Sequence, residues 1–231
     1  RDGKKGDTLV IGGGPCSYNP EPIADFFDIF YMGEGEVSYD ALLELYKVYK
    51  HSDMTREEFL IKVSNIPGLY VPELYEVTYK EDGTIASFAP RFEDVPATIT
   101  KTVVMDHSKV TYPEKPVVSF MKLTQDRVVL EIMRGCIRGC RFCQAGMIYR
   151  PTRPKDVNLL KGYAEKMLAS TGHEEITFSS LSSSDYEELP ELTDCLIEKM
   201  DNEHVNISLP SLRIDAFSLD VMSKIQDVKK S

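Results

Sequence analysis

The stretch RVVLEIMRGCIRGCRFCQAG, residues 127–146, holds three of the five cysteines of this 231-residue chain within eight positions. Its first part is an apolar run rich in valine, leucine and isoleucine, which is typical of a buried β-strand. Glycines lie before the first and second cysteines, so we expect the thiols on a flexible loop directly after that strand. The fold of the second half of the chain and its chemistry both depend on this stretch.

The cysteine spacing is Cys136-x3-Cys140-x2-Cys143. A structural zinc site usually takes four ligands in two separated pairs, so zinc would need Cys195 or a distant histidine as its fourth ligand. Thiolates also hold iron–sulfur clusters, and three of them on one short loop suit three corners of a [4Fe–4S] cube. One iron would then lack a protein ligand, as catalytic metal sites keep an open position. The remaining cysteines are too scattered for a disulfide framework, which favours a reducing compartment, with the cytoplasm as the expected location.

Helical and strand-like patterns alternate after this loop. This order predicts βα units and therefore an α/β fold with a parallel sheet, or the first part of a barrel. In such folds the chemistry lies at the carboxyl ends of the strands, where the cysteine loop would also lie. The expected elements are a strand at 127–135, a helix at 155–173 closed by Gly172, a strand at 174–183, a helix at 186–200, a strand at 204–214 and a helix at 218–228.

Composition and charge exclude several classes of function. The chain is 42% hydrophobic and 28% charged, carries a net charge of −10 and has no basic run longer than two residues. Binding of nucleic acid through its phosphates is therefore not indicated. No apolar run reaches the ~18 residues of a membrane span, and no signal peptide is visible. The chain starts at Arg1 and stops within a helix-like pattern, so we expect a fragment of a longer protein.

The first half of the chain also predicts α/β structure. An apolar run at 8–11 leads into Gly12, Gly13 and Gly14, and Asn19 is expected to cap a helix that starts at Pro20. Apolar residues at helical spacing predict a helix over 38–50.

The rest of the first half predicts one more helix, then a linker to the second domain. Thr55 and Glu58 form a capping-box pattern for a further helix that ends before a region of different character. Residues 66–122 alternate in polarity and contain the turn sequence EDGT at 81–84, which predicts a β-rich linker with a hairpin. We therefore expect one domain over 1–65, the linker over 66–122 and a second domain over 123–231.

The second domain resembles the radical S-adenosylmethionine (SAM) superfamily. The resemblance rests on the C-x3-C-x2-C motif, on aromatic Phe142 before the last cysteine, and on the position of the motif after the first strand of a βα series. It implies that Cys136, Cys140 and Cys143 hold a [4Fe–4S] cluster whose remaining iron binds the amino and carboxylate groups of SAM. It also implies reductive cleavage of SAM to methionine and a 5′-deoxyadenosyl radical, with Phe142 near the adenine.

The ends of the next two strands supply further candidates. In the family the second strand ends in a small-residue motif, often Gly-Gly-Glu, that binds the SAM amino group. Here serines take that place, so Ser180 and Ser182 are candidates, while the alternative is a serine-rich strand end that caps the next helix. Arg213, at the end of the third strand, could bind a carboxylate with both nitrogens, or form a surface ion pair. We expect Asp185 to begin a helix and Arg134 to be exposed.

The first domain resembles the last third of the cobalamin-binding domain that precedes the radical domain in B12-binding radical SAM proteins. The resemblance rests on the strand and glycines at 9–14 and on Gly-Glu-Gly-Glu at 33–36. It implies that Gly12 and Gly13 allow a close approach to cobalamin. The family's Asp-x-His-x-x-Gly motif for the lower ligand is absent here. Either it lies before Arg1, or this group of proteins does not bind cobalamin.

The sequence thus predicts a radical SAM enzyme with [4Fe–4S] and SAM as cofactors and a reductant protein, such as flavodoxin or ferredoxin, as partner. Its substrate is not indicated, and no set of catalytic acid and base residues is visible; His107 is expected to be structural or exposed. The alternative is a non-catalytic iron–sulfur module for electron transfer or sensing. That alternative requires a fourth protein ligand, which only Cys195 or Cys16 could supply.

Overall fold

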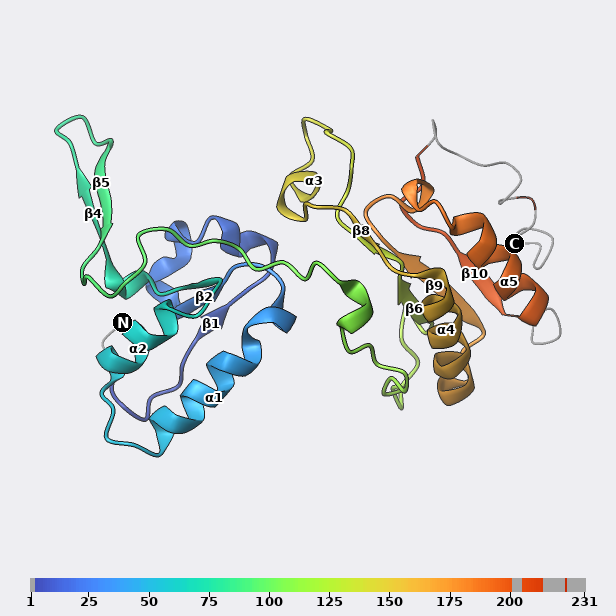
Figure 1. Ribbon diagram of the computed structural model, residues 1–231, viewed down its shortest axis with the longest axis horizontal. Helices are drawn as coiled ribbons and strands as arrows, with labels where there is room; N and C mark the ends of the chain where they lie inside the picture. The colour runs from blue at the N-terminus through green and yellow to red at the C-terminus, as the bar shows by residue number, and fades with distance from the viewer. Residues whose placement is uncertain (1–2, 201–204, 214–222, 224–231) are drawn as a thin grey trace. The chain divides into compact units, whose positions relative to one another are not determined.

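The computed structural model describes residues 3–200, 205–213 and 223. It divides into two units, Arg1–Val104 and Met105–Ser231, each with its own core (Figure 1). The boundary falls inside the expected linker over 66–122. The helix expected at 218–228 lies outside the described residues.

The first unit is built around a small mixed sheet. Strand β2 (Ile29–Tyr31) lies in its centre, parallel to β1 (Ile11–Gly12) and antiparallel to β3 (Leu69–Tyr70). Helices α1 (Tyr39–Lys50) and α2 (Arg56–Ser64) contribute to the same hydrophobic core. Every residue of β2 is buried, as expected for a central strand that packs on both faces.

The start of α2 confirms the capping box. The Thr55 hydroxyl accepts a hydrogen bond from the Glu58 amide (3.2 Å), and the Glu58 carboxylate accepts one from the Thr55 amide (2.8 Å). The expected helix after Asn19 was wrong. Two 3-10 turns, η1 (Pro15–Tyr18) and η2 (Glu21–Phe26), occupy this region, and Asn19 follows the first of them. The prolines at 15, 20 and 22 lack the amide hydrogens that a longer α-helix would need.

The hairpin predicted at EDGT is present. Strands β4 (Tyr75–Tyr79) and β5 (Ile85–Pro90) pair antiparallel, and Gly83 in the turn has a φ of +80°. Figure 1 shows this hairpin projecting from the rest of the first unit. A short 3-10 turn, η4 (Pro72–Leu74), leads from β3 into the hairpin.

The second unit contains the predicted βα alternation. Strands β6 (Val128–Glu131), β9 (Glu175–Ser179) and β10 (Asn206–Ser208) are all parallel, and β9 lies between the other two. Helix α4 (Val157–Thr171) connects β6 to β9, and α5 (Leu189–Met200) connects β9 to β10. The structure confirms the predicted α/β class and the end of α4 at Gly172, which is left-handed with a φ of +70°.

Helices α4 and α5 contact each other and share one core with the sheet. Alternate residues of β6, Val128 and Leu130, are buried, whereas Val129 between them is 42% exposed. Successive side chains of a strand point to opposite faces, so the helices cover one face of β6 and leave the other open. No helix among the described residues is both long enough and apolar enough to cross a membrane.

Candidate metal centre

The three clustered cysteines lie on one loop at the carboxyl end of β6. After β6 the chain forms the short strand β7 (Met133–Arg134), which pairs antiparallel with β8 (Arg153–Pro154). The residues between these two strands form the cysteine loop, which includes the short helix α3 (Ala145–Ile148). The pairing of β7 with β8 closes the base of the loop. Because the cysteine loop follows β6, it lies at the carboxyl edge of the parallel sheet, where α/β folds place their chemistry, as predicted.

Gly135 makes the base of the loop possible. Its φ is +84°, and a Cβ atom there would lie 2.5 Å from the carbonyl oxygen of Pro151 and 2.7 Å from that of Tyr149. Both contacts are with backbone atoms, so a side chain would force the two arms of the loop apart. Glycine is required at this position by conformation and by space.

All three thiols are free and half-buried. The Cys136 sulfur accepts a hydrogen bond from the Arg138 amide (3.4 Å), and the Cys143 amide donates to the carbonyl oxygen of Cys140 (3.0 Å). No atom lies within 4 Å of a Cβ atom built on Gly139. The loop therefore presents accessible sulfur atoms with free space beside the backbone that joins them.

Cysteine sulfur is the side-chain donor that holds iron–sulfur clusters. Among residues 3–200, 205–213 and 223, no three histidine, cysteine, aspartate or glutamate side chains are arranged to hold a metal ion as they stand. A [4Fe–4S] cube takes one thiolate per iron, so its ligand sulfurs stay apart. Three free cysteines on one glycine-containing loop fit that donor set.

The other two cysteines lie elsewhere. Cys195 is half-buried on α5, where Lys161 and Lys199 are its charged neighbours. Cys16 is exposed in the turn η1 of the first unit. Neither is placed on the cysteine loop.

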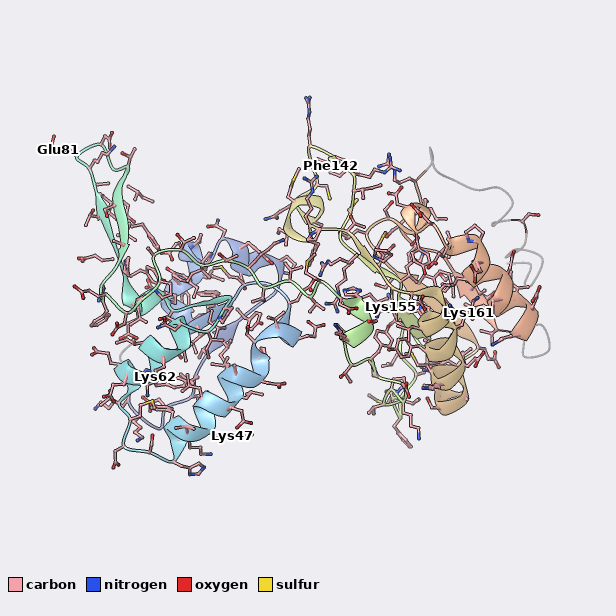
Figure 2. The ribbon with its side chains drawn as sticks, in the orientation of Figure 1. Lys47, Lys62, Glu81, Phe142, Lys155 and Lys161 are labelled. Carbon is pink, nitrogen blue, oxygen red and sulfur yellow. The ribbon has the colours of Figure 1, made fainter. Side chains whose placement is uncertain are left out.

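Phe142 is 92% exposed on the cysteine loop (Figure 2). Ile137 and Met147 of the same loop are exposed as well. An exposed aromatic ring next to a metal ligand is available to stack against a ligand or a partner. The predicted contact of Phe142 with adenine stays a prediction.

The serine-rich segment after β9 connects the ends of two strands. The Ser180 and Ser183 hydroxyls share a hydrogen bond (3.0 Å), and Ser183 donates to the carbonyl oxygen of Pro210 beyond β10 (2.7 Å). Ser182, the other predicted candidate, is buried in the same turn. The serines are therefore at the carboxyl ends of the strands, and part of their role is to hold those ends together.

Arg213 is next to the cysteine loop. Its guanidinium nitrogen Nη1 lies 3.9 Å from the Cys140 sulfur, and its amide donates to the Ser184 hydroxyl (3.2 Å). The sequence pattern predicted a site role for Arg213 but did not indicate that it would lie beside a cysteine. Ser184, which holds its backbone, was not among the predicted site residues.

An ion pair joins the cysteine loop to the turn after β9. Arg138 of the loop binds the Asp185 carboxylate with two nitrogens, one of them 3.0 Å from its oxygen acceptor. This contact lowers the pKa of Asp185 against the opposing effect of burial, and the positive charge of Arg213 lowers it further. Asp185 is the acidic residue in the first turn of the 3-10 turn η6 (Ser183–Asp185), one of its two expected roles. It does not cap α5, which begins only at Leu189.

Buried and half-buried charged groups gather near the base of the loop, around β7 and β8. Arg134 donates to the Glu131 carboxylate (2.8 Å), so the expected exposure of Arg134 was wrong. Lys155 is only 2% exposed, and its ammonium lies 4.2 Å from the centre of the Tyr112 ring (Figure 2). His107 is buried near these groups, and burial, together with Arg134 and other cations, lowers its pKa. Only its tertiary contacts reveal that Lys155 is buried against the Tyr112 ring, because no motif in the surrounding sequence indicates this.

The glycine turn of the first unit combines packing with exposure. Gly12 is buried, and a Cβ atom there would lie 2.8 Å from the Phe30 ring. Gly13 is exposed with open space around it, and Gly14 has a φ of +85°. Gly12 is therefore needed for packing against Phe30, whereas Gly13 is open to an approaching ligand.

The Gly-Glu-Gly-Glu segment of the first unit is used internally. A Cβ atom on Gly33, whose φ is +118°, would lie 2.2 Å from the carbonyl oxygen of Thr102. The Glu34 carboxylate accepts a hydrogen bond from the Val104 amide (2.6 Å). These contacts hold the last residues of the first unit against the end of β2.

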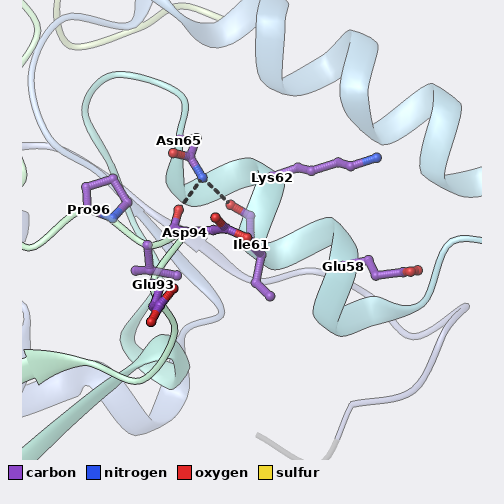
Figure 3. Close-up of a pocket in the computed structure, with 8 residues that line it drawn as sticks. Glu58, Ile61, Lys62, Asn65, Glu93, Asp94 and Pro96 are labelled. Carbon is purple, nitrogen blue, oxygen red and sulfur yellow. Dashed lines mark hydrogen bonds between the residues drawn. The ribbon is translucent and has the colours of Figure 1, made fainter.

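A hollow of about 780 Å³ lies elsewhere in the first unit, between α2 and the segment 93–96 (Figure 3). The Asn65 side-chain amide bridges its walls by donating to the carbonyl oxygens of Ile61 (2.9 Å) and Asp94 (2.8 Å). None of the predicted site residues lines it.

The fold and the loop define a class: an α/β protein whose second unit carries a three-cysteine loop at the carboxyl end of the parallel strand β6. Comparison with known proteins gives the family. Residues 1–72 match the family model "Radical SAM proteins, N-terminal", and residues 130–230 match "Radical SAM superfamily". Together these regions make up most of the chain, which belongs to the radical SAM superfamily.

One curated relative is the uncharacterised protein MJ0966 of Methanocaldococcus jannaschii. It is 30% identical over 217 residues, which are 94% of this chain and 40% of the relative. Among solved structures, two of the radical SAM methyltransferase TsrM from Kitasatospora setae are similar, one with cobalamin and a [4Fe-4S] cluster, the other with tryptophan and a SAM analogue. Their identities are 16% and 17%, with TM-scores of 0.46 and 0.45, and each match covers 95% of this chain and 40% of TsrM. The chain thus spans about two fifths of the proteins it matches.

Proposed function

We propose that this chain is the part of a radical SAM enzyme that holds a [4Fe–4S] cluster and begins the SAM site. The observation that carries the proposal is the loop with free Cys136, Cys140 and Cys143 at the carboxyl end of β6. The match of residues 130–230 to the superfamily model supports it.

The chain's own residues have distinct roles in this proposal. The three cysteines hold the cluster as thiolates, and the glycines at 135 and 139 allow the loop to fold around it. Ser180, Ser182 and Arg213 lie at the strand ends, where they orient the amino acid part of SAM. Phe142 covers the adenine and excludes water from that side.

When bound, the cluster supplies the electron that cleaves SAM to methionine and a 5′-deoxyadenosyl radical. The protein contributes orientation and exclusion of water, as in other cofactor enzymes, so no acid–base pair is needed to start the reaction. A reductant protein such as flavodoxin or ferredoxin would supply the electron, in the cytoplasm.

Anaerobic reconstitution with iron and sulfide, followed by electron paramagnetic resonance of the reduced protein, tests the proposal. We expect a cluster signal that changes on addition of SAM and is lost in Cys136→Ala, Cys140→Ala and Cys143→Ala. Cys195→Ala is the matched control and should keep the signal. Formation of 5′-deoxyadenosine with dithionite and SAM is the assay for cleavage.

The same experiment separates the alternative function. An electron-transfer or sensing module would bind its cluster through a fourth protein ligand. Its signal would stay unchanged with SAM, and Cys195→Ala or Cys16→Ala would lose the cluster. Cys195 lies on α5 and Cys16 in the first unit, so neither candidate for a fourth ligand belongs to the cysteine loop.

Cobalamin binding by the first unit is a separate proposal. It is supported by the exposed Gly13 after β1 and by the resemblance of residues 9–14 and 33–36 to the end of a cobalamin-binding domain. Because the sequence has no Asp-x-His-x-x-Gly motif, we expect any bound cobalamin to lack a histidine ligand from this chain. Absorption spectra of the chain with hydroxocobalamin, compared for wild type and Gly13→Val, test this binding.

A further inference from the structure

Arg138 and Asp185 form the direct ionic connection between the cysteine loop and the turn after β9. Two guanidinium nitrogens face the two carboxylate oxygens, with 3.0 Å between Nε and Oδ2. The Asp185 side chain is 6% exposed and that of Arg138 36%. Such a two-point contact fixes both the distance and the orientation of the two groups, which a single point charge does not.

The position of Arg138 in the sequence explains how this ion pair restrains the cysteine loop. Arg138 lies between Cys136 and Cys140, and its amide donates to the Cys136 sulfur (3.4 Å). Gly139, the next residue, is exposed, and a Cβ atom built on it would meet open space. Holding the Arg138 side chain therefore holds the backbone between the first two thiols.

The other end of the pair is firmly anchored. The Asp185 amide donates to the carbonyl oxygen of Ser182 (3.0 Å) within the turn η6. Ser183, fully buried in the same turn, donates to the carbonyl oxygen of Pro210. The carboxylate thus belongs to a part of the unit that is tied to both β9 and β10.

We propose that the Arg138–Asp185 pair is a positioning device that arranges the cysteine loop before the cluster binds. Neither residue is a ligand. A loop that is already ordered loses less conformational entropy when it binds, and outer-shell contacts of metal sites typically change affinity about 10–100-fold. The proposal rests on the proposed function for the identity of the bound group.

The unit provides a matched control at the opposite end of the sheet. Arg127, just before β6, pairs with Glu175 at the start of β9, with 2.7 Å between nitrogen and oxygen. This pair also joins the β6 and β9 regions, but at the amino ends of the strands. Loss of this pair should affect the sheet without affecting the cysteine loop.

The test compares Arg138→Ala, Asp185→Asn and Arg127→Ala in the complete chain. One readout is hydrogen exchange of the amides of residues 137–143 in the metal-free protein. The second is the rate at which a chelator removes the reconstituted cluster. We expect Arg138→Ala and Asp185→Asn to raise the exchange rates about tenfold and cluster loss about 10–100-fold. Arg127→Ala should change neither rate, and Arg138→Lys should fall between wild type and Arg138→Ala.

The outcomes separate this inference from the proposed function. A wild-type chain that takes up no iron and sulfide would refute the proposed function, while the exchange measurement would still report on the loop. Equal exchange and cluster loss in Arg138→Ala and Arg127→Ala would overturn the positioning role. If Arg138→Ala does not fold, Asp185→Asn and Arg138→Lys decide between the same outcomes, since both keep side chains of similar size.

Discussion

Substitution of Gly135 by alanine is expected to open the base of the cysteine loop, whereas the same substitution at Gly139 is expected to have little effect. The two glycines lie four residues apart, and each directly precedes a cysteine of the loop. Gly135 has a φ of +84°, and its Cβ would lie 2.5 Å and 2.7 Å from two carbonyl oxygens. Gly139 has neither constraint, because its Cβ would meet open space.

The magnitude follows from these two constraints. A non-glycine residue in the left-handed region costs about 1–3 kcal/mol. Relief of the backbone contacts adds about 1 kcal/mol or more, as in other overpacked sites. Gly135→Ala should therefore destabilise the second unit by about 2–4 kcal/mol, a large part of the 5–15 kcal/mol that is typical of a domain. Gly139→Ala should stay within about 0.5 kcal/mol of wild type.

Urea unfolding followed by circular dichroism measures this difference. Because the chain has two units, two transitions are expected, and only that of the second unit should move in Gly135→Ala. Iron content after reconstitution provides the second measurement, which should fall in Gly135→Ala and not in Gly139→Ala. Equal unfolding midpoints and equal iron contents for the two variants would refute the argument.

Three further predictions concern charge and backbone conformation. Arg138 lowers the pKa of Asp185 below its ordinary value of 3.8, so the folded state gains stability above that value and loses it as the pH falls through the lowered pKa. Asp185→Asn should therefore lower the urea midpoint at pH 7, and the difference from wild type should disappear in strong acid. The pKa of His107 is lowered from 6.5 because burial disfavours its charged form, so stability should be complete above 6.5 and decrease as the pH falls below it. His107→Gln should remove this part of the pH dependence between pH 7.5 and 5, and an unchanged slope would contradict the assignment. Gly33→Ala should destabilise the first unit by about 2–4 kcal/mol, because a side chain with that φ would collide with Thr102, but the transition of the second unit should stay in place.

Local signals in the sequence were reliable where neighbouring residues alone decide the outcome. The capping box of Thr55 and Glu58, the hairpin turn at Gly83 and the end of α4 at Gly172 were all predicted and are all present. Each depends on contacts within a few residues or on a glycine in the left-handed region. The failure after Asn19 has a local cause as well, because three prolines in eight residues favour short 3-10 turns.

The polar residues of the site were less predictable. Arg134 was expected in solvent and pairs with Glu131, and the pairing of Asp185 with Arg138 was not predicted. A charged side chain can reach several partners, and its choice depends on which elements the fold brings near it. Lys155 is the clearest case, since its burial against the Tyr112 ring has no signature in the sequence.

The sequence by itself determined the three-cysteine spacing, the place of the loop after a buried strand and the alternation that makes the sheet parallel. These features depend on residue order and on the periodicity of apolar side chains, which are local properties. Only the tertiary structure decided that Arg138 meets Asp185 and that Arg213 approaches the Cys140 sulfur. These partners are separated by 47 and 73 positions in the chain, and they meet because parallel strands bring their carboxyl ends to the same edge of the sheet.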